Sequence, residues 1–582
     1  MSFTDLREFV DHLEKHRRLK RVTAPVSRDL EIAEITDRVS KSPAGRNVAL
    51  LFERVEGFDM PVLVNAFGAQ DRMGAALGVS HLDELGERVA KLLDLRLPGT
   101  FAERLGKLHT LFDLVKAGPK RVTTAPCQEV VETARPSLAG LPALQCWPGD
   151  GGRYITLPGV FTRDPRTGQR NVGMYRLQVF DERTLGMHWQ THKGGAEHHR
   201  VAEEQATSAT RMPVAIALGG DPAMIYAASA PLPPGVDEVV FAGWLRGKGV
   251  ELVRCVTNDL EVPAQAEIVL EGYVDPRERR REGPFGDHTG YYSLARDYPV
   301  FHLTAVTRRA RPIYPTTIVG RPPQEDYWLG KATERLFLPI IRLMLPEVVD
   351  MNMPAEGIFH NLVIVSIRKR YPGQARKVMS ALWGMGLMML AKTIVVVSEH
   401  VNVHDLSEVA WRVTGNIDPR RDLMIIEGPM DDLDHAALRH RYGGKLGVDA
   451  TEKSALDDVA QPWPDEIVMT EEMRARVTRR WKEYGLLASS GGCSRPSSSS
   501  TPCSRCPLPT SQWCWPPAAG PAGGRSAGSR PRWSAAARAR WRPTASSIAS
   551  STRRIRARRA ATCPSACSAW ARCARWRARA RR

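Results

Sequence analysis

Long apolar runs and cysteines are scarce in most of this chain of 582 residues, and both absences narrow its class. No apolar run reaches the roughly 18 residues of a membrane-spanning helix, because the longest, residues 386–397, is interrupted by Lys392. The first 486 residues hold only Cys127, Cys146 and Cys255, too few for a disulfide framework, which indicates a reducing, cytoplasmic environment. The N-terminus also lacks the basic stretch and apolar run of a secretory signal peptide.

An excess of one charge is missing from the body of the chain, although the whole sequence has a net charge of +18. The first 486 residues carry 63 Lys and Arg against 64 Asp and Glu, whereas residues 487–582 carry 19 Arg and no Lys, Asp or Glu. The charge that would attract nucleic acid or an anionic membrane is therefore confined to the tail. A neutral body is typical of an ordinary globular protein, and we expect no nucleic acid as its partner.

The tail, residues 487–582, mixes Ser, Pro, Ala, Arg, Cys and Trp without a helical or strand period, and we expect it to be disordered. One interpretation is an arginine-rich arm for nucleic acid, and another is a metal knuckle around Cys503 and Cys506. Natural basic arms mix Lys with Arg and contain few Trp and Cys, whereas this tail has six Trp and seven Cys. We therefore favour a GC-rich coding region translated out of frame, which resequencing of the gene would test.

Three successive patterns of helix and strand signals divide the first 486 residues and predict a multidomain α/β (α+β) fold. Residues 1–115 combine an amphipathic helix over residues 3–17, in which Ser2 and Asp5 have capping-box spacing, with short strands and a helix over 82–95. Residues 116–320 contain β-rich runs punctuated by Gly, Pro and Asp, the pattern of an antiparallel sheet or barrel. These runs lie at residues 155–161, 171–180, 213–217, 224–227, 268–274 and 301–308.

Residues 321–460 alternate strands with helices, which predicts a parallel sheet covered on both faces. The expected strands are 362–367, 393–398 and 422–427, and the expected helices are 374–385 and 405–413. A last helix is expected within residues 461–486, beginning near Thr470.

Glu282 and Asp287 lie five residues apart in the segment EGPFGDH, which glycine and proline make bend sharply. Two carboxylates held on such a loop can be driven to different pKa values, and general acid and base catalysis needs that difference. For an isolated pair of acids, the alternative is a solvated surface turn.

Other candidate residues lie on both sides of this loop in the sequence. Arg176, on an expected strand, can form a two-pronged contact with a carboxylate or phosphate, or a simple ion pair at the rim of the sheet. His188 and His192 have the i, i+4 spacing of a helical zinc site, but the Trp, Thr and Gly around them favour a single ligand contact from His192. We expect His198 and His199 to be solvated.

Glu238 and Lys445 are weaker candidates. Glu238 follows PPGVD, where an acid is ordinarily an exposed residue at the start of a helix. Lys445 follows a glycine pair in GGKLGVDAT and can reach an anion, although the segment lacks the glycine spacing and the following Ser or Thr of a P-loop.

Together, the segments NVGMYR, MHWQTHKGG, EGPFGDHTGYY and GGKLGVDAT occur in an order and at separations that resemble the UbiD family. Members of that family are reversible decarboxylases of aromatic and α,β-unsaturated acids that use prenylated FMN. The resemblance covers roughly residues 1–486. It implies an N-terminal α/β region, a central split β-barrel that binds the flavin, and a C-terminal α/β domain.

The resemblance also implies roles for individual residues. Asn171, His192 and Glu238 match positions that bind a divalent ion, usually Mn²⁺, at the cofactor phosphate, and oxygen and imidazole ligands suit that ion. K⁺ is a further candidate ion. The implied cofactor contacts are those of Asn171, Met174, Tyr175, Arg176, His192, Lys193, Gly194 and Glu238, with Lys445 at the phosphate.

Arg176, Glu282 and Asp287 match the catalytic set of the family, in which Asp at the last position accompanies phenolic substrates. Loss of CO2 from an aromatic acid needs an electron sink, which the prenylated flavin of the family supplies. Glu282 or Asp287 would deliver the proton that replaces CO2, and Arg176 would hold Glu282 ionised when required.

By the same resemblance, the substrate is an aromatic acid of quinone biosynthesis, either a polyprenyl-hydroxybenzoate or a dihydroxynaphthoate. A flavin prenyltransferase would supply the cofactor, the chain would form a homodimer or homohexamer, and a prenylated substrate would bring it to a membrane surface. Two alternatives stay open. One is a conventional FMN oxidoreductase, which would not need the paired acids and Arg176, and the other is a nucleic-acid-binding protein that acts through the arginine-rich tail.

Overall fold

The computed structural model describes residues 2–93, 115–191, 193–207, 210–233, 235–457, 459 and 461–485. His192 and the tail from residue 486 onward lie outside the described residues, so the expectations for both stay predictions. The chain divides into two units, Met1–Ile467 and Val468–Arg582. Within the described residues, no helix is long and apolar enough to cross a membrane.

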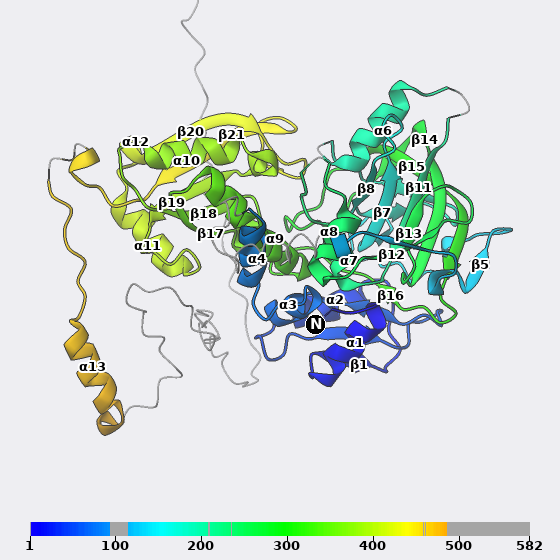
Figure 1. Ribbon diagram of the computed structural model, residues 1–582, viewed down its shortest axis with the longest axis horizontal. Helices are drawn as coiled ribbons and strands as arrows, with labels where there is room; N and C mark the ends of the chain where they lie inside the picture. The colour runs from blue at the N-terminus through cyan, green and yellow to red at the C-terminus, as the bar shows by residue number, and fades with distance from the viewer. Residues whose placement is uncertain are drawn as a thin grey trace, which may run out of the picture. The chain divides into compact units, whose positions relative to one another are not determined.

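The N-terminal part of the first unit is a four-stranded sheet with helices packed against it (Figure 1). Its strands, in spatial order, are β1 (Leu19–Val22), β2 (Ala49–Phe52), β3 (Val62–Val64) and β16 (Tyr314–Pro315). Its helices are α1 (Leu6–Lys15), α2 (Glu31–Ser40), α3 (Gln70–Ala76) and α4 (Asp83–Leu93). The expected capping box between Ser2 and Asp5 was wrong. Asp5 is itself the N-cap of α1, and its carboxylate accepts the N–H groups of Arg7 and Glu8.

A strongly curled sheet of nine antiparallel strands forms the centre of the unit and is the expected split barrel (Figure 1). Its spatial order is β6-β9-β10-β15-β14-β11-β7-β8, with β5 paired to β15. The strands are β5 (Val130–Glu132), β6 (Arg153–Ile155), β7 (Pro158–Arg163), β8 (Arg170–Gly173), β9 (Leu177–Val179), β10 (Thr184–Met187), β11 (Met212–Leu218), β14 (Ile268–Glu282) and β15 (Arg296–Arg308).

Three helices and a small sheet accompany the curled sheet. The helices are α6 (Gly194–Glu204), α7 (Pro222–Ala227) and α8 (Glu238–Arg246), and the small sheet has the order β13 (Glu261–Pro263), β12 (Glu251–Arg254) and β4 (Lys120–Val122). Short 3₁₀ turns lie at Pro126–Gln128 and Leu138–Gly140. Residues 224–227 were expected to be a strand and are helical, because the Asp221 side chain caps α7 and Pro222 occupies its first turn.

Two of the expected central strands are each broken into two. Residues 155–161 divide between β6 and β7, and residues 171–180 divide between β8 and β9. The second break leaves residues 174–176 outside any strand. It is this irregular link, rather than a strand, that positions Arg176.

The C-terminal part of the unit is a five-stranded mixed sheet with the order β17-β18-β19-β21-β20. Its strands are β17 (Val348–Asn352), β18 (Leu362–Ile367), β19 (Thr393–Ser398), β20 (Leu423–Pro429) and β21 (Tyr442–Asp449). Its helices are α9 (Glu325–Met344), α10 (Gln374–Trp383), α11 (Leu406–Asn416) and α12 (Pro419–Asp422), with 3₁₀ turns at Ala355–Gly357, Gly386–Leu390 and Ala455–Asp457.

Only the middle of this sheet is parallel. β18 and β19 run parallel, as expected, and β21, which was not expected, runs parallel to β19, whereas β17 and β20 are antiparallel edge strands. The expected strand at residues 422–427 is therefore not the third parallel strand. That place is taken by β21, which carries Lys445.

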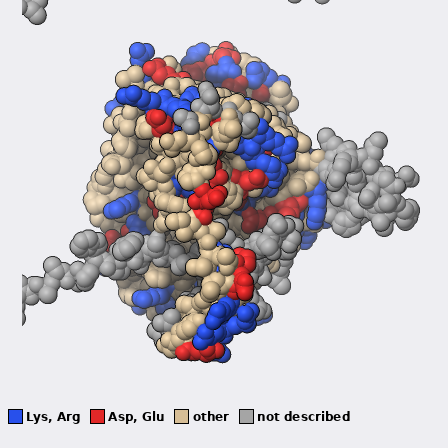
Figure 2. All heavy atoms as spheres, turned by 90° about the vertical axis from the view of Figure 1, so that its left-hand side faces the viewer, with Lys and Arg blue, Asp and Glu red and all other residues tan. Residues whose placement is uncertain are grey.

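In the second unit the described residues form α13 (Glu471–Arg480), which confirms the expected last helix, and a 3₁₀ turn at Trp481–Tyr484. None of the side chains in these two elements is buried. On the face of the molecule in Figure 2, basic and acidic side chains are intermixed, in line with the balanced charge of the first 486 residues.

Candidate active site

Glu282 is the last residue of β14, and the chain bends sharply immediately after it. Gly283 has a φ of +95°, which favours glycine, and its N–H donates to Gln178 Oε1 at 2.8 Å. A Cβ added to Gly286 would lie 2.2 Å from the Trp147 ring, so this glycine lets the loop approach the ring closely. Glu282 is 0% exposed and Asp287 is 6% exposed, which excludes a solvated surface turn.

The carboxylate of Asp150 holds this loop in place through backbone hydrogen bonds. Asp150 Oδ1 accepts the N–H of Gly286 at 2.7 Å, and Oδ2 accepts those of Cys146 at 3.1 Å and Trp147 at 2.8 Å. Burial raises the pKa of Asp150, and these backbone donors oppose part of the rise. The path of the loop is therefore fixed by a group that the sequence motifs did not reveal.

Arg176 bridges the two acids, as the resemblance implied. Its Nε donates to Glu282 Oε1 at 2.9 Å, its Nη2 donates to Glu282 Oε2 at 3.1 Å, and its Nη1 bonds to Asp287 Oδ2. Nη2 also donates to Ser293 Oγ at 3.0 Å, and the guanidinium lies over the Phe285 ring at 4.8 Å. Since Arg176 is itself buried, the structure brings together one cation and two carboxylates away from solvent.

The electrostatics of these two acids differ from the sequence-based expectation of divergent pKa values. Burial alone would raise the pKa of Glu282, but the His188 hydrogen bond and the Arg176 charge outweigh it and lower that pKa. Burial would likewise raise the pKa of Asp287, and the Arg176 charge and the His288 contacts bring it well below its usual range. In the protein without substrate, both carboxyls are ionised.

His188 is a fourth member of this group, and sequence reasoning missed it. Its Nδ1 lies 3.1 Å from Glu282 Oε2, and its ring centroid lies 4.4 Å from that of Tyr298. The i, i+4 spacing to His192 drew attention to zinc instead, because Glu282 is 94 residues further along the chain. Among the described residues, no group of three or more His, Cys, Asp or Glu side chains is arranged to hold a metal ion.

A third carboxyl, that of Asp326 at the start of α9, also belongs to the surroundings of this group. Burial raises the pKa of Asp326 to about 7, and the charge of nearby His288 opposes the rise. Burial would lower the pKa of His288, but its hydrogen bond with Asp287, at 2.8 Å, and the charges around it raise that pKa to about 9. No motif in the sequence pointed to Asp326.

The N-terminus of α6 lies against Asn171 on β8. A Cβ added to Gly194 would fall 1.9 Å from Asn171 Oδ1, so only glycine permits this approach. The N–H of Gly195 donates to the Tyr175 hydroxyl at 3.2 Å, and Lys193 occupies the N-cap without a side-chain capping bond. Asn171, Tyr175, Lys193 and Gly194, which were predicted separately, are thus brought together at a helix end that favours anions.

Glu238 joins the same region from the first residue of α8. Its Oε2 accepts the N–H of Val172 at 3.0 Å, and burial raises its pKa to about 7. Asn171 Nδ2 is buried and has no hydrogen-bond partner among the described residues. The unpaired Nδ2 donor of Asn171 and the open N-terminus of α6 fit an acceptor such as a phosphate oxygen. The Glu238 carboxyl, to which no described cation is bonded, fits a divalent ion beside that phosphate, with His192 outside the described residues.

Met174 and Lys445 are the last two of the predicted cofactor contacts. Met174 is partly buried between two core clusters, and its N–H donates to Ala228 O at 2.8 Å. Lys445 Nζ donates to the carbonyls of Met389 at 2.7 Å and Ala391 at 2.9 Å, and burial lowers its pKa to about 8. None of the hydrogen bonds of Lys445 in the described part of the chain reaches Asn171 or Glu238, so its proposed contact with phosphate stays a prediction.

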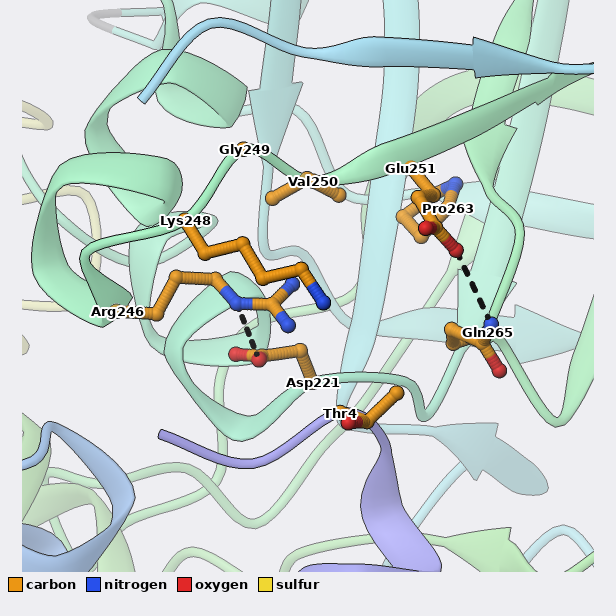
Figure 3. A pocket seen from close by; sticks show the side chains of 9 residues that line it. All are labelled: Thr4, Asp221, Arg246, Lys248, Gly249, Val250, Glu251, Pro263 and Gln265. Atoms are coloured by element: carbon orange, nitrogen blue, oxygen red, sulfur yellow. Dashed lines mark hydrogen bonds and ion pairs between the residues drawn. The ribbon is translucent and has the colours of Figure 1, made fainter. Parts of the chain in front are cut away.

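His198 and His199 were expected to be solvated and are instead buried on α6, with His198 Nδ1 lying 2.9 Å from Thr162 Oγ1. A separate polar pocket lies near the N-terminus of the chain, where Arg246 and Lys248 extend toward Asp221 (Figure 3). Arg246 Nε lies 3.0 Å from Asp221 Oδ2, and the space left between these side chains holds no more than about one water molecule. That pocket is too small for a flavin and shares no residue with the acid group.

Family comparisons cover most of the body of the chain. Three models of the 3-octaprenyl-4-hydroxybenzoate carboxy-lyase family, UbiD, match in succession: the N-terminal domain at residues 10–89, the Rift-related domain at 120–322 and the C-terminal domain at 327–450. An uncharacterised protein of Archaeoglobus fulgidus is 52% identical over 484 residues, which cover 83% of this chain and 99% of that relative.

Two solved structures show the same fold. The closed form of vanillic acid decarboxylase from Sedimentibacter hydroxybenzoicus is 28% identical, with a TM-score of 0.73 over 83% of this chain and 99% of that one. The UbiD-class enzyme HmfF from Pelotomaculum thermopropionicum, solved in complex with FMN, is 30% identical, with a TM-score of 0.68 over 81% and 98% of the two chains. An evolved dimeric form of HmfF was solved in complex with prFMN.

Proposed function

The chain belongs to the UbiD family of carboxy-lyases, and we propose that it removes CO2 from a phenolic aromatic acid with the help of prenylated FMN. The observation that carries this proposal is the buried group in which Arg176 bonds to both Glu282 and Asp287. Vanillic acid decarboxylase and the prFMN complex of HmfF support the substrate class and the cofactor.

Prenylated FMN would act as the electron sink when CO2 leaves, and the residues of the chain would supply the charge and the proton. A substrate carboxylate bound near Arg176 offsets part of the guanidinium charge, which raises the pKa of Glu282 and lets it take up a proton. Glu282 then delivers that proton to the carbon that has lost CO2. Once CO2 departs, Arg176 again favours the ionised form of Glu282, while Asp287 orients the phenol ring through its hydroxyl.

The cofactor would be held by the region around Asn171. We assign a divalent ion, Mn²⁺ in the first instance, to Glu238, His192 and the amide oxygen of Asn171, because the buried Glu238 carboxyl has no cation bonded to it among the described residues. The Nδ2 donor of Asn171, which has no partner among those residues, would donate to the phosphate. The N-terminus of α6 and Lys193 would hold the phosphate, and Lys445 would add a contact from the C-terminal sheet. K⁺ is a second candidate ion for the same region.

We extend the proposal to the pathway, the cellular location and the assembly of the chain. We propose a role in quinone biosynthesis, on a polyprenyl-hydroxybenzoate or a dihydroxynaphthoate, in the cytoplasm. A flavin prenyltransferase would supply the cofactor, a homodimer or homohexamer would be the assembly, and a prenylated acid would require contact with a membrane surface.

Co-expression with a flavin prenyltransferase tests the proposal. Mass spectrometry of the bound cofactor should find prenylated FMN, and a panel of phenolic acids should include one that releases CO2. Unmodified FMN together with NAD(P)H oxidation would replace the proposal with a conventional flavin oxidoreductase.

A further inference from the structure

The His188 side chain is fixed from several directions beside Glu282. It follows β10, is 6% exposed, and its backbone N–H donates to Arg176 O at 3.4 Å. Its Nδ1 lies 3.1 Å from Glu282 Oε2, while its ring packs on Tyr298. These contacts hold the ring in one orientation and determine where its second nitrogen, Nε2, must lie.

The contact with Glu282 determines which nitrogen of His188 carries the proton. Glu282 already accepts two N–H groups from Arg176 and is ionised, so it can only accept a hydrogen bond from Nδ1. Burial and the Arg176 charge lower the pKa of His188, which keeps the imidazole neutral near pH 7. With its single proton on Nδ1, the neutral ring presents Nε2 as a hydrogen-bond acceptor.

That acceptor has no partner in the part of the chain that the structure describes, where Nε2 is buried and makes no hydrogen bond. An unsatisfied buried polar atom costs about 1–3 kcal/mol, so such atoms usually face a ligand or a water molecule. Asp432 lies close enough for the charge of His188 to lower its pKa. It cannot satisfy Nε2, because a carboxylate only accepts hydrogen bonds, and it already accepts one from Arg441.

We propose that His188 Nε2 accepts a hydrogen bond from a hydroxyl group on the aromatic ring of the substrate, and so makes His188 a specificity-determining residue. This inference rests on the proposed function and narrows its substrate class to acids that carry a hydrogen-bond donor on the ring. A hydroxyl that donates to Nε2 also strengthens the Nδ1–H donor that faces Glu282. Recognition of the ring substituent is thereby linked to the acid that handles the proton.

The test compares two acids of similar shape, one with hydroxyl donors and one without. Binding of 3,4-dihydroxybenzoate and 3,4-difluorobenzoate to the flavin-loaded protein would be measured by isothermal titration calorimetry. We expect the wild-type protein to prefer the dihydroxy acid by about 10–100-fold, the range of one buried hydrogen bond. The release of CO2 from the dihydroxy acid would be measured separately on the same samples.

Two variants separate the two ring nitrogens of His188, and a third, at His302, is their control. In His188→Asn the amide can still donate to Glu282 but does not reach the position of Nε2, and we expect the preference to fall about tenfold. In His188→Gln the longer amide reaches that position with its oxygen, and we expect most of the preference to remain. His302→Asn is the matched control, because His302 lies on β15 and is paired with Glu278 away from the acid group.

Each outcome decides the inference independently of the proposed function. Equal binding of the two acids by the wild-type protein, or an undiminished preference in His188→Asn, would overturn it. A preference lost in His188→Asn and kept in His188→Gln supports it even if no CO2 is released, and in that case the proposed function fails alone. If His188→Asn does not fold, His188→Phe, which has no acceptor, takes its place. An equal loss of the preference in His188→Gln and His188→Phe would then overturn the inference.

Discussion

Two polar groups in the central part of the chain differ in how their charges are balanced. Around Glu282, Arg176 and His188 supply the donors and the positive charge, so buried carboxylates stay ionised without any ligand. Around Glu238, no described cation is bonded to the carboxyl, its pKa rises to about 7, and Asn171 Nδ2 has no partner among the described residues. Described residues of the chain balance the charges of the first group, whereas we propose that a bound ion and a phosphate balance the second.

This difference indicates what each group can do. Carboxylates that are already paired with cations inside the protein can take up and return a proton with little rearrangement, since small changes in nearby charge shift the pKa of the carboxyl. An unbalanced group gains free energy when a cation and an anion arrive together, which suits retention of a phosphate-bearing cofactor.

Glu282→Gln should lower turnover by about 10²–10⁴-fold, the usual contribution of a general acid, while the flavin stays bound. CO2 release and flavin absorbance on the same preparation measure the two effects. Glu267→Gln is the matched control, because Glu267 is equally buried and paired with Arg7 outside the site. Full activity of Glu282→Gln would remove Glu282 from the proton-transfer step.

Glu238→Gln should weaken Mn²⁺ retention by about 10–100-fold or more and lower flavin occupancy with it, because a neutral amide balances less of the ion's charge. Elemental analysis and flavin absorbance after purification give the two readouts. Glu261→Gln, at an acid paired with Arg121 on the small sheet, controls for the loss of one negative charge. Unchanged metal content would mean that Glu238 is not a ligand.

Ionisation of Asp326 and ionisation of Glu282 should change the stability of the fold in opposite directions. Asp326 has a folded pKa of about 7, raised by burial, so wild-type protein is destabilised as pH rises through 4–7 and Asp326→Asn should melt about 2–5 °C higher at pH 8. Glu282 has a lowered pKa, so its ionisation stabilises the fold above its unfolded pKa, and Glu282→Gln should melt lower at pH 8.

Melting curves between pH 4 and pH 8 check both halves of this prediction. The Asp326→Asn difference should shrink as pH falls from 7 toward 4, because Asp326 then becomes protonated in the folded protein. The Glu282→Gln difference should persist over the same range, because the lowered pKa of Glu282 keeps it ionised until pH falls below the ordinary value of a glutamate. The Asn variant keeps the acceptor for the Tyr327 N–H, which isolates the charge. The same sign for both variants at pH 8 would contradict the contrast.

Lysine substitutions should have the smallest effects. Lys193→Met removes a cation at the N-terminus of α6 and should lower flavin occupancy by about tenfold, since one charge-assisted hydrogen bond is lost. Lys445→Met should lower it less, because two donors of Lys445 are already used by backbone carbonyls of the C-terminal sheet. A larger loss for Lys445→Met, with an unchanged melting temperature, would place its ammonium group at the phosphate.

The sequence predicted the members of both groups better than their arrangement. Arg176, Glu282 and Asp287 lie in ordered segments whose charged residue types indicate acid and base chemistry, and the structure brings them together. The sequence did not predict that both acids would be ionised, because their ionisation depends on how Arg176 and His188 are buried with them. Asp326 carries no motif, and its proximity to His288 arises only when α9 packs beside the loop.

The fold shows the same division between local and non-local information. Strands with uniform apolar runs, such as β18 and β19, begin and end where the sequence predicts. Residues 224–227 have the same apolar character but follow a capping aspartate and a proline, and that local signal makes them helical. The place of β21 between β19 and β20 depends on pairing across the sheet, which residue spacing along the chain does not reveal.

Asp150 has a consequence for how the active-site loop can evolve. Its carboxylate bonds to backbone N–H groups of Gly286, Cys146 and Trp147, and those groups are present whatever side chains the neighbouring positions carry. The course of the loop backbone therefore does not depend on whether Glu or Asp stands at position 287. If that position selects the substrate, as we propose, a single substitution there changes the selection while the backbone that carries it stays in place.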